Sequence, residues 1–159
     1  MITLALYVPG DDVDRPRYAD GYHGADDAHE QFEFILGILT ERPRAVPWAT
    51  YLAVLDDNRI AGLCSLKTEP DELGWVEISY GTLPAHQGQG VAKAMAAGLV
   101  AIAEDNGARA FAHTRPEENA STRVLLANGF IRVSEIIDPE DGLVWRWERG
   151  RKAGRDVYA

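Results

Sequence analysis

The chain has 159 residues, of which 46% are hydrophobic and 26% charged, the length and composition of one globular domain. Its net charge of −9 argues against a broad nucleic-acid surface, because such surfaces gather lysine and arginine. The single cysteine, Cys64, excludes a disulfide within this chain, and its apolar neighbours predict a buried, inert thiol. We find no signal-peptide pattern and no apolar run of about 18 residues, so we expect a soluble, cytoplasmic protein without a membrane partner.

The N-terminal part of the chain predicts one strand and one helix. Residues 2–8 are rich in β-forming side chains and are followed by Pro9 and Gly10, which end a strand. Residues 28–40 carry apolar side chains at a spacing of three to four behind Asp26 and Asp27, which is typical of a helix with one buried face.

The rest of the chain predicts a meander of three strands, a crossover and a final hairpin. Short turns make the three meander strands antiparallel, whereas the crossover helix makes the third strand parallel to the next one. The predicted strands are residues 50–55, 60–68, 74–82, 110–114, 130–137 and 143–148, and the predicted helices are residues 90–106 and 118–128.

This order of elements predicts a single α+β domain over residues 1–150, followed by a basic tail at residues 151–159. The sheet should change from antiparallel to parallel between the strands at residues 74–82 and 110–114. A gap at such a change, with a helix N-terminus at its mouth, is where ligands bind in sheets of this kind.

Residues 83–93 have the features of an anion-binding loop. Gly88 and Gly90 stand one residue apart at the start of the helix, and no acidic side chain occurs in this stretch. Glycines allow close approach of the backbone, and the first amides of a helix have no partner within the helix. A phosphate is the natural ligand, although the loop is neither a P-loop nor a full dinucleotide fingerprint.

The loop reads Gln87-Gly88-Gln89-Gly90-Val91-Ala92 and matches the pattern Gln/Arg-x-x-Gly-x-Gly/Ala. It follows a strand and Pro84, and about 30 residues later comes a segment that runs from Asn119 to Gly129 and Phe130. Over residues 75–133 the chain therefore resembles the GNAT superfamily of N-acetyltransferases, and within it the branch of ribosomal-protein N-terminal acetyltransferases and related small-molecule acetyltransferases.

The resemblance implies a mostly antiparallel twisted sheet with one splayed parallel strand pair and helices on both faces. It implies acetyl-CoA as the donor, bound through its diphosphate at residues 87–92 and through its pantetheine arm along residues 80–83. Lys93 adds charge near the 3′-phosphate or faces water. The implied cofactor-binding residues are Tyr80, Gly81, Thr82, Leu83, Gln87, Gly88, Gln89, Gly90, Val91, Ala92, Lys93, Asn119 and Ser121.

Two residues are the catalytic candidates. Glu77, in the middle of a strand, is the candidate base that accepts the proton of the amine, and the alternative is a structural carboxylate paired with an arginine or facing water. Ser121 is the candidate partner of the leaving thiolate, and the alternative is an ordinary residue of the first helical turn. Leu125 stands where many members of the superfamily have a tyrosine acid, and Glu118 stands where they have an asparagine.

The resemblance implies direct transfer of the acetyl group to a primary amine of a small molecule or of a peptide or protein. The acceptor pocket would involve Tyr22, His23, Asp26, Asp27 and Glu30, which could bind a cationic amine or could face water at a helix start. We expect no metal, because His23, His29 and His113 have no ligand-like spacing. His86 could touch a phosphate or could be an exposed loop residue, and we expect the exposed residue. We expect Trp145 and Trp147 to pack in the core or in a homodimer.

Two other functions remain open from the sequence. The first is a CoA-binding regulatory or interaction module that has lost efficient chemistry, which the missing tyrosine and the displaced asparagine favour. The second is a protein that binds a nucleotide phosphate with the same loop.

Overall fold

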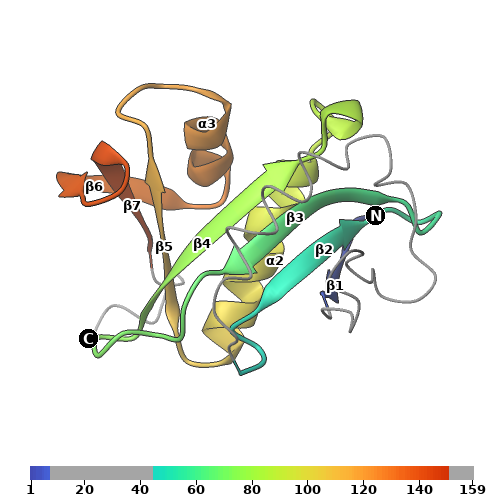
Figure 1. Ribbon diagram of the computed structural model, residues 1–159, viewed down its shortest axis with the longest axis horizontal. Coiled ribbons are helices and arrows are strands. Elements are labelled where there is room, and N and C mark those ends of the chain that lie inside the picture. Colours follow the sequence, from blue (N-terminus) through green and yellow to red (C-terminus); the bar gives the residue numbers. More distant parts are fainter. Residues whose placement is uncertain (8–44, 151–159) are drawn as a thin grey trace.

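The computed structural model describes residues 1–7 and 45–150. The helix predicted at residues 28–40, the acceptor residues predicted at positions 22–30 and the tail at residues 151–159 lie outside the described residues. In the described part of the chain, seven strands form one sheet, which is accompanied by two α-helices and a short 3-10 helix (Figure 1).

The first four strands of the sheet pair with one another in chain order, and each of these pairs is antiparallel, so the meander predicted for the second to fourth strands is confirmed. They are β1 (Thr3–Leu6), β2 (Thr50–Val54), β3 (Ile60–Leu66) and β4 (Trp75–Thr82). Every residue of β2 and β3 is buried, because both strands lie inside the sheet and carry almost only apolar or small side chains.

A crossover then leads from β4 to a parallel neighbour. It consists of η2 (Pro84–His86) and α2 (Val91–Asp105), and it ends in β5 (Arg109–Thr114), which pairs parallel with β4 as predicted. The helix α2 lies behind the sheet in Figure 1 and packs on β3, β4 and β5. Gly107 follows α2 with a φ of 78°, a left-handed conformation that suits glycine at the end of a helix.

The C-terminal elements are α3 (Ala120–Ala127), β6 (Phe130–Asp138) and β7 (Gly142–Arg149). The order of strands in the sheet is β1-β2-β3-β4-β5-β7-β6, so β7 lies between β5 and β6. Trp147 is buried and donates a hydrogen bond from its indole N–H to Thr114 Oγ1 at 2.9 Å, so its packing is in the core.

The parallel pair opens after three residue pairs. Its register runs from Trp75 opposite Arg109 to Glu77 opposite Phe111, and beyond this point β4 pairs with β3 while β5 pairs with β7. Figure 1 shows the two strands close together at one end and diverging towards α3. The predicted gap in the sheet is therefore present.

The fold class is confirmed as α+β, with a mixed sheet and one parallel strand pair. The helices α2 and α3 pack against each other, so a helix on the opposite face of the sheet would have to come from outside the described residues. Among the described residues, no helix combines the length and the apolar character that crossing a bilayer requires.

Candidate active site

The N-terminus of α2 forms an open cradle of backbone amides. Gly88 and Gly90 have φ angles of 75° and 81°, and Gly90 caps the helix without a side-chain hydrogen bond. The Gly90 carbonyl accepts the first hydrogen bond of α2, which the amide of Ala94 donates. The amides of residues 91–93 therefore have no acceptor within the helix. A Cβ atom built on either glycine would meet no protein atom within 4 Å. The space over the amides is therefore open to a ligand.

This cradle is one wall of a cavity of about 470 Å³ between β4, α2 and α3. The size is in the range of small-molecule sites. The cavity brings together most of the residues that the sequence predicted for the cofactor, namely Tyr80, Thr82, Gln87, Gly88, Gly90, Val91, Ala92, Lys93 and Ser121.

Four predicted cofactor residues do not line the cavity. The Leu83 side chain is buried, and its amide donates to the carbonyl of Ala61. Asn119 is the N-cap of α3, because its Oδ1 accepts a hydrogen bond from the Thr122 amide at 3.0 Å. Gln89 lines a separate hollow beside Met1, and Gly81 lines neither space. For Gly81 a contact with the ligand would have to come from the backbone, whereas Leu83 already uses its amide with Ala61 and its carbonyl with His86.

The cavity also includes three residues outside the predicted cofactor set, which are His86, Ala120 and Val124. The expectation that His86 is exposed is wrong, because only 8% of its surface is accessible. The turn of η2 carries its ring away from solvent within the loop at residues 83–93. The position of His86 within the predicted anion-binding loop was the sequence signal that could have placed it at the cavity.

Tyr80 and Ser121 both line the cavity and contact each other there. The Tyr80 Oη lies 3.1 Å from Ser121 Oγ, and it donates a hydrogen bond to the Ser121 carbonyl oxygen at 3.3 Å. Burial raises the pKa of Tyr80, and the hydrogen bond with Ser121 only partly opposes this effect. The phenol is therefore neutral at physiological pH and acts as a hydrogen-bond donor.

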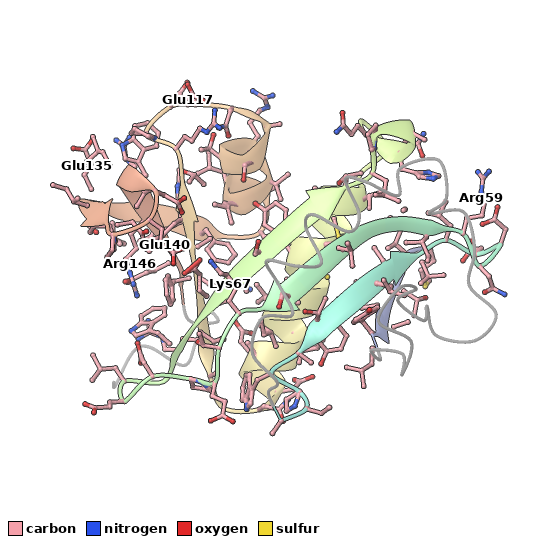
Figure 2. The ribbon with its side chains drawn as sticks, viewed as in Figure 1. Arg59, Lys67, Glu117, Glu135, Glu140 and Arg146 are labelled. Atoms are coloured by element: carbon pink, nitrogen blue, oxygen red, sulfur yellow. The ribbon has the colours of Figure 1, made fainter. Side chains whose placement is uncertain are left out.

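Glu77 belongs to a different cluster of charges. The neighbouring residues Val76 and Ile78 are buried in the core, so the alternation of the strand turns Glu77 to the face away from α2. Its Oε2 lies 2.8 Å from Lys67 Nζ, and its Oε1 lies 3.9 Å from His113 Nδ1. Lys67 is labelled in Figure 2, near the junction of β4 and β5. The structural pairing that the sequence left open is thus with a lysine rather than an arginine.

His113 is a neighbour that the sequence analysis considered only as a metal ligand. Its Nδ1 also lies 3.8 Å from Asp138 Oδ2, and its Nε2 is buried without a hydrogen-bond partner in the described part of the chain. The amides of Glu140 and Asp141 lower the pKa of Asp138 by donating hydrogen bonds to it, so this carboxylate is ionised at neutral pH. Within residues 1–7 and 45–150, no group of three or more metal-binding side chains is placed to hold an ion.

Cys64 is fully buried in β3, directly opposite Tyr80 in the β3–β4 register. Burial raises the pKa of the Cys64 thiol, so the thiol is protonated at physiological pH. The prediction of a buried thiol is confirmed.

Residues 13–130 match the model of the Acetyltransferase (GNAT) family. The chain belongs to this family. No curated protein matches it significantly.

Several solved GNAT structures are similar to the chain. A chimera of Vibrio cholerae spermidine N-acetyltransferase SpeG and hSSAT is 14% identical, with 93% of this chain and 94% of that chain covered and a TM-score of 0.62. RimL, a ribosomal L7/L12 alpha-N-protein acetyltransferase in complex with coenzyme A, is 22% identical over 77% and 69%, with a TM-score of 0.58. The aminoglycoside acetyltransferase AAC(6')-Ib, in complex with ribostamycin and coenzyme A, is 18% identical over 70% and 68%, with a TM-score of 0.57. At these identities the likeness shows a shared fold.

As a member of the GNAT family, the chain departs from the pattern described above at Leu125. Leu125, which stands in place of the tyrosine acid, is fully buried in the core. A hydroxyl group is nonetheless present nearby, because Tyr80 reaches Ser121 from the opposite side of the gap.

Proposed function

We propose that the protein is an acetyl-CoA-dependent N-acetyltransferase that transfers the acetyl group directly to a primary amine. One observation carries the proposal: the open amide cradle at Gly88 and Gly90 shares its cavity with two hydroxyl groups where the sheet parts. The GNAT family and the coenzyme A complexes of similar structures support the choice of donor.

Donor binding would use mainly the backbone. The amides at residues 88–93 and the positive end of the α2 dipole would hold the diphosphate. Beyond Glu77, the edge of β4 that turns away from β3 is not paired with β5. It is available to the amide groups of the pantetheine arm, which would add to the sheet in the manner of a strand.

The transfer itself needs a proton acceptor and a partner for the sulfur. Glu77 would accept the proton of the amine, directly or through a water molecule, as the nitrogen forms its bond to the carbonyl carbon. The carbon–sulfur bond then breaks, and Ser121 would donate a hydrogen bond to the departing sulfur. We propose no acyl-enzyme step, because Cys64 is buried and protonated.

The acceptor is proposed only as a class. The similar structures include enzymes named for spermidine, for a ribosomal protein and for aminoglycosides. All three acceptors present amines, but they share no larger feature. The net charge of −9 favours a cationic amine weakly. A cytoplasmic location, the absence of nucleic-acid and membrane partners, and a homodimer remain predictions, as does a single domain over residues 1–150.

The test is the release of free thiol from acetyl-CoA in the presence of pooled amines, which include amino acids, polyamines, aminoglycosides and peptide N-termini. We expect acetyl-CoA to raise the melting temperature and at least one pool to accelerate thiol release. No stabilisation by acetyl-CoA at concentrations well above micromolar would contradict the proposal.

A CoA-binding module without efficient chemistry is the second candidate. Three observations favour it: Leu125 is buried, Asn119 is used as a helix cap, and Glu77 is held in an ion pair with Lys67. Binding of acetyl-CoA without thiol release in any pool would support this module. Displacement of CoA by ATP at similar concentrations would instead support a nucleotide-phosphate binder.

A further inference from the structure

The contact between Tyr80 and Ser121 spans the opening of the sheet. Tyr80 lies on β4 beyond the last residue pair with β5, and Ser121 lies in the first turn of α3. Both side chains line the cavity that contains the amide cradle. This hydrogen bond therefore lies in the same cavity as the cradle, beside the stretch of β4 that the pantetheine arm would follow in the proposed function.

The two hydroxyl groups carry two hydrogens and can arrange them in two ways. In the closed arrangement, Tyr80 donates to the Ser121 carbonyl at 3.3 Å and Ser121 donates to Tyr80 Oη at 3.1 Å. In the open arrangement, Tyr80 donates to Ser121 Oγ, and the Ser121 hydroxyl is free to donate elsewhere. A negatively charged sulfur beside Ser121 favours the open arrangement, because hydrogen bonds in a chain polarise each other.

We propose that Tyr80 is a positioning residue for acetyl transfer, whose hydroxyl donates to Ser121 Oγ and so turns the Ser121 hydroxyl towards the leaving thiolate. The inference rests on the proposed function, since it requires CoA in this cavity. It gives the chain a tyrosine hydroxyl that acts through Ser121 although Leu125 is apolar, and this tyrosine comes from β4 instead of α3.

The step balances without a proton from tyrosine. The amine nitrogen bonds to the carbonyl carbon, its proton goes to Glu77, and the carbon–sulfur bond breaks with the electron pair on sulfur. Ser121 and Tyr80 stabilise that charge through hydrogen bonds until a proton from solvent reaches the sulfur. Tyr80 suits this role because a buried phenol stays neutral and does not bring a second negative charge to the site.

The readout is the thiol pKa of CoA bound to the full-length protein, measured from the ultraviolet absorbance of the thiolate with S-methyl-CoA as the reference. Stabilisation of the thiolate should place this pKa below that of free CoA. Tyr80→Phe and Ser121→Ala should each raise the thiol pKa of bound CoA by about 1 to 2 pH units relative to the wild-type complex. The double variant should raise it no further than the larger single change, because Tyr80 acts through Ser121.

Tyr51→Phe is the matched control. The Tyr51 hydroxyl donates to the Pro47 carbonyl at 2.7 Å from β2 and does not line the cavity. Both tyrosine variants should lower the melting temperature slightly, but only Tyr80→Phe should raise the thiol pKa. The proposal is overturned if Tyr80→Phe binds CoA and leaves the thiol pKa at its wild-type value. Failure of the wild-type protein to bind CoA would instead overturn the proposed function on which the inference rests.

Discussion

The amide cradle and the opening of the sheet belong to one candidate site, but they are built in different ways. The cradle comes from consecutive residues, and its shape depends on two glycines and a helix start. The opening depends on pairs far apart in the chain, such as Tyr80 with Ser121, which are separated by 41 positions. The proposed donor site is therefore a local property of the backbone, whereas the proposed chemistry depends on side chains that only the fold brings together.

The largest effect on activity should come from a substitution beside the opening of the sheet. In Glu77→Gln, turnover with an acceptor from the amine screen should fall about 100-fold near neutral pH, because the proton acceptor is lost. The loss should be smaller at high pH, where hydroxide and free amine replace the base. CoA affinity, measured by calorimetry, should change less than about twofold, since Glu77 does not line the cavity.

Glu148→Gln is the control for this variant. Glu148 also forms an ion pair, with Arg146 at 2.8 Å, but it lies on β7. Its loss should leave turnover near the wild-type value. Wild-type rates for Glu77→Gln at every pH would remove Glu77 from the mechanism and make its pair with Lys67 purely structural.

An intermediate effect, on CoA affinity, should come from a glycine substitution in the cradle. Gly90 and Gly107 flank α2 with φ angles of 81° and 78°, and a Cβ atom at either would meet no protein atom within 4 Å. Gly90→Ala and Gly107→Ala therefore impose a similar backbone strain, about 1 to 2 kcal/mol. Only Gly90→Ala places a methyl group in the cradle, so only this variant should weaken CoA binding, by about tenfold or more in calorimetry. Equal affinities for the two variants would show that the cradle does not hold the ligand.

The smallest effect should come from Cys64. Cys64→Ala should leave turnover within about twofold of wild type, because the raised pKa of the buried thiol keeps it protonated and direct transfer needs no acyl carrier. Iodoacetamide should modify the native protein much more slowly than the unfolded protein, as followed by mass spectrometry. Rapid alkylation of the folded protein together with loss of transfer would point to an acyl-enzyme.

The same contrast explains what the sequence could predict. The strands, α2 and the loop before it follow from local patterns of apolar residues, glycines and turns, and all of them were placed within a few residues. The parallel pairing of β5 followed from the crossover, and so did the gap beside it. The fold class and the cradle were therefore accessible from the sequence.

The partners of the catalytic candidates were not accessible in this way. Lys67, His113 and Asp138 reach Glu77 or its neighbours from just after β3, from β5 and from the end of β6, respectively. No local pattern sets these distances, because they depend on the register and splay of the sheet. Asn119 is different: its spacing to Thr122 is a capping signal, and it could have been recognised as the N-cap of α3 from the sequence.

The central claim is that the amides at the start of α2 bind the diphosphate of CoA. The most direct measurement is a titration of the 15N-labelled protein with CoA, followed in 1H–15N correlation NMR spectra. The account predicts that the amides at residues 88–93 shift most and saturate with the ligand, while the amide of Gly107 at the other end of α2 does not move. Saturable binding that leaves the amides at residues 88–93 unchanged would contradict it.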